Sequence, residues 1–316
     1  MAEKIKLSII IVNWNTKLLL MQCIKSIVQS LKFKVQSDSS KFKVEYEIII
    51  VDNGSTDGSI EEIKKFIVPS FAEASAGKHN SKFIVQLIEN HANLGFAKGN
   101  NIGIKEAKGE YIMLLNSDTI VKDGSLEKLI EFLDNNKNYD IVGPRLLNSD
   151  LTVQASCGRF PNLFVTFIML FLEHFNGRYV MFSPENSQEV EWLMGAAILA
   201  RKKVFDNIDG LDEKIFMYME EIEWFYRARQ KNIKTFFFKD SEIIHLGRGS
   251  SRSGKKEPIL HIYRGLIYFF QKHKTPFEVI IVKLMLKLKA GMAYFFGIIK
   301  NDKYLIETYG EAIKIN

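Results

Sequence analysis

Four short apolar runs, each followed by polar residues, constrain the fold of this chain more than any other feature of its sequence. They are Leu7–Val12, Tyr46–Val51, Phe83–Ile88 and Tyr111–Leu115. Continuous apolar runs of this length are typical of strands buried on both faces, and segments with helical patterning separate them. Alternating strands and helices favour right-handed crossovers and a mostly parallel sheet. We therefore expect an α/β protein with a Rossmann-like sheet and flanking helices.

The polar residues that follow these strands are expected to meet at one edge of the sheet. A parallel sheet aligns the carboxyl ends of its strands, and ligands of open α/β sheets bind outside those ends. The polar segments are Asn13–Thr16, Asp52–Gly58, Asn90–Gly103 and Asn116–Asp118. This edge is therefore the predicted functional site.

Asp118, just beyond the fourth strand, has two interpretations when its own stretch is considered alone. An aspartate in this position often caps the next turn or helix, through a side-chain oxygen that accepts a backbone N–H. The alternative role is that of an oxygen ligand for a hard divalent cation at the carboxyl edge of the sheet. The convergence of three earlier polar segments on the same edge favours the cation.

The positive net charge of +6 is concentrated in the C-terminal tail. From Leu246 onward there are 13 Lys and Arg against 5 Asp and Glu. The tail is strongly apolar over Pro276–Lys300, but Lys283, Lys287 and Lys289 interrupt it. These lysines disfavour a spanning helix and favour one that lies in the membrane interface with lysines reaching lipid phosphates. A core helix or a homodimer contact is the open alternative, and the excess of bulky apolar residues disfavours nucleic acid.

The number and spacing of the cysteines indicate a reducing compartment. Cys23 and Cys157 form no spacing motif, which disfavours a disulfide framework or a zinc site. The N-terminus leads directly into an apolar strand that is too short for a signal peptide, so export is not indicated. We expect a cytoplasmic protein that contacts the inner face of the cell membrane. A second apolar run, Leu163–Leu172, is too short to span a bilayer and suits a core helix or an interfacial one equally.

In order and spacing, several segments resemble the family 2 glycosyltransferases of GT-A fold. They are the first strand, Asp52–Gly58, Asn93–Gly103, Asn116–Asp118, Gly195-Ala196 and Glu220-Glu221. The resemblance covers roughly residues 6–250. The Asn-x-Gly-Phe-Ala block, the Asn-x-Asp form and Arg159-Phe-Pro161 are most similar to the subgroup that includes bacterial rhamnosyltransferases and related cell-surface polysaccharide enzymes.

The resemblance implies an inverting, metal-dependent transfer of a sugar from a nucleotide diphosphate donor to a lipid-linked or polysaccharide acceptor. The first expectation for the donor is dTDP-L-rhamnose, and UDP-sugars are the alternative. It also implies a GT-A domain at residues 1–250, with a nucleotide-binding half at 1–120 and an acceptor half at 121–250. Residues 251–316 would then form the basic, apolar helical tail that associates with the membrane.

The chemistry of this reaction requires a counter-charge for the leaving diphosphate, which a divalent cation supplies. By resemblance, Asp118 and His245 hold Mg²⁺ or Mn²⁺, although a single histidine near a strand end is as often structural. Asp52 is expected to read the base, and Lys98 either contacts phosphate or is simply solvated. The full set of donor-binding residues is Asn13, Asn15, Asp52, Asn93, Gly95, Lys98, Asn116 and Gly195.

Inverting transfer also requires one general base that deprotonates the acceptor hydroxyl. In the family this base is the second member of an acidic pair, usually Glu-Asp, and here the pair is Glu220-Glu221. We expect Glu221 to be the base, with Glu220 and Glu223 as alternatives. The competing interpretation is an exposed acidic helix start favoured by the helix dipole.

Two other function classes remain open. A sugar-phosphate nucleotidyltransferase also uses such a sheet and a metal, but it would carry a Gly-rich basic loop where this chain has Asn13–Thr16. A catalytically inactive scaffold that binds sugar nucleotides is harder to exclude, because Glu221 replaces the usual aspartate.

Overall fold

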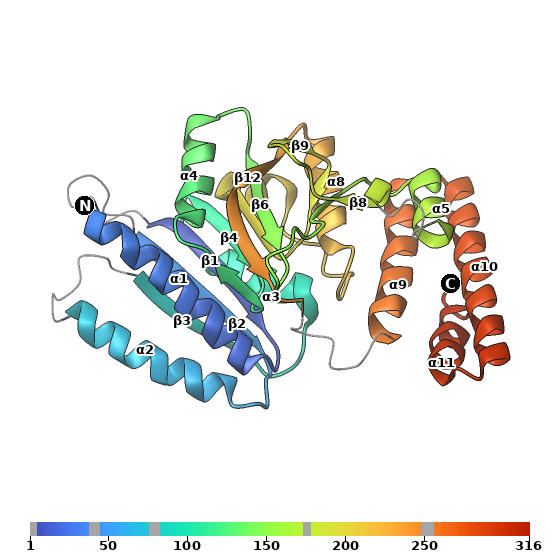
Figure 1. Ribbon diagram of the computed structural model, residues 1–316, viewed down its shortest axis with the longest axis horizontal. Coiled ribbons are helices and arrows are strands. Elements are labelled where there is room, and N and C mark those ends of the chain that lie inside the picture. Colours follow the sequence, from blue (N-terminus) through green and yellow to red (C-terminus); the bar gives the residue numbers. More distant parts are fainter. Residues whose placement is uncertain (1–4, 38–44, 76–82, 173–177, 248–255) are drawn as a thin grey trace.

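The computed structural model describes residues 5–37, 45–75, 83–172, 178–247 and 256–316. Figure 1 shows two parts, a sheet lobe around β1 and β4 and a helical lobe formed by α5, α9, α10 and α11. The main sheet runs in the order β3 (Phe83–Asn90), β2 (Glu45–Asn53), β1 (Ile5–Asn13), β4 (Tyr111–Leu115), β11 (Ala197–Arg201), β6 (Ile141–Leu147), β12 (Thr235–His245) and β5 (Thr119–Val121), while β9 (Gln188–Val190) pairs with β12.

The first four strands of the chain form the parallel half of this sheet. β1 pairs with β2 and β4 in parallel, and β2 pairs with β3 in the same sense. In the second half, β12 and β6 are also parallel, whereas β11 lies antiparallel between β4 and β6. The expected α/β fold is therefore confirmed, and the carboxyl ends of β1, β2, β3 and β4 lie at one edge.

Helices cover both faces of the sheet, because successive residues of a buried strand point to opposite sides. Ile9 and Ile11 of β1 belong to a core shared with α1 (Lys17–Ser37), α2 (Ser59–Ser75) and α4 (Ser125–Asn135). Ile10 belongs to a second core on the other face. That core is shared with α3 (Gly95–Glu106), α7 (Lys202–Ile208) and α8 (Glu220–Gln230).

Helix α2 is longer than the sequence suggests. The polar and small residues at 69–82 favour a surface loop after a helix that ends near Ile67, but α2 continues to Ser75. The segment Phe71-Ala-Glu-Ala74 contains two alanines and a glutamate, which are good helix formers, so the first part of the expected loop is wrong.

The helical lobe has a hydrophobic core of its own. It contains α5 (Leu163–Phe171), α9 (Lys256–His273), α10 (Pro276–Lys300) and α11 (Lys303–Ala312). Leu170 of α5 and Met219 share this core with Leu266, Phe270 and Val282. A small sheet of β10 (Trp192–Leu193), β7 (Cys157–Gly158) and β8 (Met181–Phe182) comes from the stretch of chain on both sides of α5. The boundary proposed at residue 250 lies outside the described residues, and α5 packs with the C-terminal helices although it precedes that boundary.

Helix α10 has one buried and one exposed apolar face. Val282, Leu286, Ala290 and Gly297 are buried in the helical lobe. The opposite side, which we call the outer face of α10, consists of Phe277, Ile280, Leu284, Leu288, Met292, Phe295, Phe296, Ile298 and Ile299, each between 45% and 68% exposed. Among the described residues, no helix has both the length and the apolar character that crossing a bilayer requires.

Candidate active site

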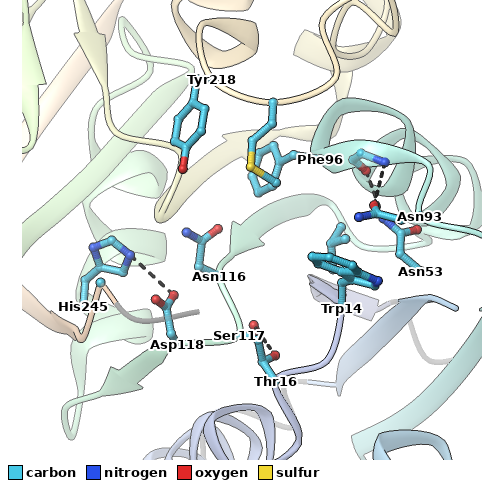
Figure 2. Close-up of a pocket in the computed structure, with 14 residues that line it drawn as sticks. Trp14, Thr16, Asn53, Asn93, Phe96, Asn116, Ser117, Asp118, Tyr218 and His245 are labelled. Carbon is cyan, nitrogen blue, oxygen red and sulfur yellow. Dashed lines mark hydrogen bonds and ion pairs between the residues drawn. The ribbon is translucent and has the colours of Figure 1, made fainter. Parts of the chain in front are cut away.

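Asp118 is brought next to His245 by strand pairing. β5 pairs with β12 in antiparallel register, so that Thr119 faces His245, and the Leu246 amide donates to the Asp118 carbonyl over 2.9 Å. The two side chains meet with His245 Nε2 3.4 Å from Asp118 Oδ1 (Figure 2). Helix α4 is N-capped by Gly124, so Asp118 is not the cap of the next helix.

A glutamine that sequence reasoning missed orients the histidine. His245 Nδ1 lies 2.9 Å from Gln154 Oε1, which only accepts hydrogen bonds. In the neutral ring, Nδ1 therefore carries the proton and Nε2 directs its lone pair towards Asp118. Metal-binding histidines are commonly fixed in this way by a partner on the other ring nitrogen.

The pair provides two of the ligands that a divalent cation needs. A carboxylate oxygen and an unprotonated imidazole nitrogen suit Mg²⁺ or Mn²⁺, which usually takes additional oxygens from water or from a bound ligand. The described residues contain no cluster of three or more His, Cys, Asp or Glu able to hold a metal. The donor set therefore fits a cation that completes its coordination with oxygens from outside the protein.

A cleft of about 220 Å³ opens at the carboxyl edge of the sheet, next to this pair. The predicted residues that line it are Asn93, Gly95, Asn116, Asp118 and His245. Thr16 and Ser117 join two of the strand tips through their hydroxyl groups, which lie 2.9 Å apart (Figure 2). The prediction that polar tips converge on one edge is thus met by the geometry of β1 and β4.

Three of the residues predicted to bind the donor do not line this cleft, and they are Asn13, Asn15 and Asp52. Asp52 is fully buried, and its carboxylate accepts from Asn13 Nδ2 at 2.7 Å and from the Ser55 amide at 2.8 Å. Asn15 has a left-handed backbone, with φ at 54°, and its side-chain oxygen accepts from the Thr56 amide at 2.7 Å. These contacts join the turns after β1 and β2, so all three residues fix the two turns that border the cleft.

Gly95, Lys98 and Gly195 take different positions. Gly95 has φ at +82°, and a Cβ at this position would overlap the carbonyl oxygen of Phe216. That carbonyl oxygen accepts a hydrogen bond from the Phe96 amide at 2.8 Å. This contact holds the start of α3 against the segment that leads to α8. Lys98 is exposed and does not line the cleft, whereas Gly195 lines a second cavity next to it.

The cleft has an aromatic wall that sequence reasoning did not identify. Trp14, Phe96 and Tyr218 line it, from the turn after β1, from α3 and from the segment before α8 (Figure 2). Trp14 was the sequence signal for this wall, because a large ring in a polar turn has no packing role there. Tyr218 and Met219 both have left-handed backbones, with φ at 64° and 77°. Consecutive left-handed residues without glycine are costly and cluster at functional sites.

The acidic pair begins α8 directly after these residues. Glu220 is 4% exposed and Glu221 is half-buried. Burial raises the pKa of both carboxyls, and the charge of Glu221 raises the pKa of Glu220 further. Backbone N–H groups, including that of Gly195, donate to the Glu221 carboxyl and oppose part of the shift in its pKa. Within the described part of the chain, Oε2 of each residue has no hydrogen-bond partner.

Glu223, the third candidate for the base, is occupied by cations. Its fully buried carboxylate accepts from Arg227 at 2.9 Å and from His273 at 3.0 Å, and Lys272 pairs with it at 2.8 Å. Burial alone would raise the pKa of Glu223, but the hydrogen bonds from His273, Lys272 and Arg227 lower it. This carboxylate links α8 to α9 and is poorly suited to accept a proton from a substrate.

The family model described as Glycosyl transferase family 2 matches residues 8–222, which include the carboxyl ends of β1, β2, β3 and β4 and Glu221. The chain belongs to glycosyl transferase family 2. The family expected from the sequence motifs is therefore confirmed.

Several curated relatives are named as hexosyltransferases or rhamnosyltransferases. Low-salt glycan biosynthesis hexosyltransferase Agl10 of Haloferax volcanii is 28% identical over 244 residues, which cover 76% of this chain and 66% of that protein. An N-acetylglucosaminyl-diphospho-decaprenol L-rhamnosyltransferase of Mycobacterium tuberculosis is 22% identical, over 68% of this chain and 70% of its own length. Rhamnosyltransferase WbbL of Escherichia coli is 26% identical, over 65% and 85%. The chain thus spans just under two thirds of the first of these relatives.

Solved structures share the fold. TarS 1-349 of S. aureus in complex with UDP superposes with a TM-score of 0.54 and 15% identity, over 95% of this chain and 74% of that one. GalNAc-T7 with UDP, GalNAc and Mn²⁺ superposes with a TM-score of 0.58 and 15% identity, over 85% and 50%. At this level of identity the match establishes the GT-A fold alone, as expected from the sequence.

Replacing Glu220 by glutamine is expected to stabilise the protein at pH 8. A carboxyl with a raised pKa binds more protons in the folded than in the unfolded state, so stability falls as pH rises above the unfolded pKa. Each unit by which burial raises the pKa corresponds to about 1.4 kcal/mol. Glu220→Gln should therefore have a higher melting temperature than wild type at pH 8, with a smaller difference at pH 4.5.

Calorimetric melting at both pH values measures this effect, and Glu307→Gln, at an exposed glutamate of α11, is the matched control. A Glu220→Gln variant that is less stable than wild type at pH 8, with the control unchanged, would contradict the raised pKa.

Proposed function

We propose that this chain is an inverting, metal-dependent glycosyltransferase that uses a nucleotide diphosphate sugar as donor. The observation that carries the proposal is that the candidate metal-binding pair and the candidate general base line two neighbouring cavities. Asp118 and His245 line one cavity, Glu221 lines the next, and Asn116, Tyr218 and His245 line both. A leaving-group site and a base thus face a shared wall, which is the arrangement that displacement at a sugar carbon requires.

The donor would lie in the smaller cleft. A divalent cation, when bound, neutralises the charge that develops on the leaving diphosphate. Asp118 and His245 would hold that cation, and Gln154 would keep the imidazole in the tautomer that can bind it. The rings of Trp14 and Phe96 offer flat apolar surfaces for the base and sugar, while Asp52 and Asn13 fix the turns around them.

Glu221 would act as the general base towards the acceptor hydroxyl. It lines the second cavity, carries an oxygen without a partner among the described residues, and has the backbone support that keeps its carboxylate in place. Burial raises its pKa above the usual range, and a base closer to the working pH accepts a proton more effectively. Glu220 is the alternative, since it lines the same cavity.

The donor that we favour is dTDP-L-rhamnose, and the acceptor is a lipid-linked or polysaccharide glycan of the cell surface. Relatives named as rhamnosyltransferases support the sugar, and the relative named for a diphospho-decaprenol substrate supports the lipid. A UDP-sugar is the alternative donor, supported by the fold shared with proteins solved with UDP.

A sugar-nucleotide-binding scaffold without activity is the second candidate. It is favoured by one observation, that burial raises the pKa of both carboxyls of the acidic pair. A nucleotidyltransferase has less support, because the turn at Asn13–Thr16 has no Gly-rich basic loop.

Replacing Glu221 by glutamine should reduce sugar transfer by about 10²–10⁴-fold, the usual contribution of a general base. Nucleotide binding should be unchanged, because the residue lies outside the donor cleft. Release of nucleotide diphosphate from a panel of sugar nucleotides with Mn²⁺ measures the activity, and Glu220→Gln is the neighbouring control. Retained activity in Glu221→Gln would overturn the assignment, and nucleotide binding without turnover in wild type would favour the scaffold.

Mn²⁺ should bind weakly to the nucleotide-free protein and at least tenfold more tightly with UDP or dTDP, since two protein ligands leave most positions to diphosphate oxygens. Titration calorimetry measures both affinities. His245→Ala should reduce the effect of the nucleotide, whereas His91→Ala, at an exposed histidine, should not. Tight Mn²⁺ binding without nucleotide would contradict the two-ligand site.

The outer face of α10 would place the enzyme on the cytoplasmic face of the membrane, where a lipid-linked acceptor lies. Nine exposed apolar residues form this face. By helical periodicity, Lys283 and Lys287 flank it on one side and Lys289 on the other, so cations border the apolar stripe as they do in helices that lie in the interface. A homodimer through the same face is the alternative.

Replacing Leu284 and Leu288 together by aspartate should reduce binding to phosphatidylglycerol vesicles at least tenfold. Each leucine is 59% exposed, and burying a leucine contributes about 1.5–3 kcal/mol. Vesicle sedimentation measures the bound fraction, and the matched control replaces the exposed Leu18 and Leu151 of the sheet lobe by aspartate. Unchanged vesicle binding, together with a dimer that the double substitution dissociates, would assign the face to a second copy.

A further inference from the structure

We infer that the cavity next to Glu221 binds the isoprenoid phosphate end of a lipid-linked acceptor, and that Arg159 pairs with its phosphate. The inference rests on the proposed function and specifies which part of the acceptor this protein recognises. Arg159 and the apolar wall of this cavity lie outside the donor cleft.

The cavity has a volume of about 400 Å³, which is larger than the donor cleft. Its walls come from α5, the small sheet, the start of α8 and one side of α9. Glu221 and Gly195 line it, and it shares Asn116, Tyr218 and His245 with the cleft. A molecule in this cavity therefore reaches the base and the donor at the same time.

Most of the cavity wall is apolar. Val165 and Met169 come from α5, Ile262 and Leu266 from α9, and Met181 from the small sheet. Sugar hydroxyls placed against such side chains would lose their hydrogen bonds to water without replacement, which is unfavourable. An isoprenoid chain gains from the same surroundings, because burial of apolar surface stabilises the complex. The wall thus selects a ligand with an apolar chain.

Arg159 is the only Lys or Arg side chain that lines the cavity within the described part of the chain. It is exposed, and its guanidinium lies 4.5 Å from the ring centroid of Tyr179. Its backbone is fixed on both sides, since the Arg159 amide donates to the Val180 carbonyl at 3.1 Å and the Phe160 amide donates to Glu191 at 2.5 Å. A guanidinium at the edge of an apolar cavity is suited to pair with a phosphate that is attached to a lipid chain.

Two buried polar atoms add to this match. Thr166 is 0% exposed and Trp192 is 4% exposed, and both line the cavity. Neither the Thr166 hydroxyl nor the Trp192 indole N–H has a hydrogen-bond partner among the described residues. Buried polar groups without partners are uncommon and call for an explanation. A ligand with polar atoms between its apolar chain and its sugar would supply those partners.

Helix α5 connects the cavity with the surface proposed to meet the membrane. Val165 and Met169 line the cavity, while Phe164 and Phe167 are 61% and 41% exposed. The same helix packs against α10, whose outer face is apolar. An isoprenoid chain that leaves the bilayer at this surface therefore has a short apolar path to Glu221.

Geranyl diphosphate is a water-soluble probe for this site. In buffer with EDTA, which prevents metal-bridged binding of diphosphate at Asp118, calorimetric titration should give at least tenfold tighter binding than geraniol or inorganic diphosphate. Arg159→Ala and Met181→Trp should each weaken binding at least tenfold, by removing the cation and by filling the cavity. The matched controls are Arg178→Ala, at an exposed arginine that does not line the cavity, and Met292→Trp, on the outer face of α10.

Binding of UDP or dTDP with Mn²⁺ is measured separately in the same variants and should be unchanged. The inference is overturned if geranyl diphosphate binds no more tightly than its two fragments, or if Arg159→Ala and Met181→Trp bind it as well as the controls do. Failure of the proposed function would instead appear as wild-type protein that binds no nucleotide, whatever the result with geranyl diphosphate.

Discussion

The antiparallel pairing of β5 with the end of β12 is the contact on which the site depends. It connects the short strand after Asp118 to the strand that carries His245, although these residues are more than a hundred positions apart. β12 is itself held in parallel register by β6, which fixes how far along the sheet His245 lies. The distance between the carboxylate and the imidazole is therefore set by backbone hydrogen bonds, and Gln154 needs only to set the orientation of the ring.

Three glutamates within one turn of α8 have different roles because their surroundings differ. Glu220 and Glu221 face a largely apolar cavity, where burial raises their pKa values. Glu223 instead contacts Arg227, Lys272 and His273, which lower its pKa. The same ion cluster fastens α8 to α9, so the contact that attaches the helical lobe also positions the acidic pair.

The C-terminal helices are part of the site as well as an appendage to it. Ile262 and Leu266 of α9 and Met169 of α5 form one wall of the cavity beside Glu221. The hydrophobic core of the helical lobe also includes Met219, which directly precedes the acidic pair. The outer face of α10 and the cavity beside Glu221 thus belong to one packing unit.

The sequence by itself determined that Asn13, Asp52, Asn93 and Asp118 lie at one edge, because a parallel sheet aligns the carboxyl ends of its strands. It also determined the acidic pair and the apolar character of the tail. Only the tertiary structure decided that Asp52 is buried and bonded to Asn13 and Ser55, that Glu223 pairs with Lys272 and His273 of α9, and that Gln154, Tyr218 and Arg159 reach the site. These outcomes depend on contacts between segments far apart in the chain, and local hydrophobic patterns carry no information about which distant side chain will be the neighbour.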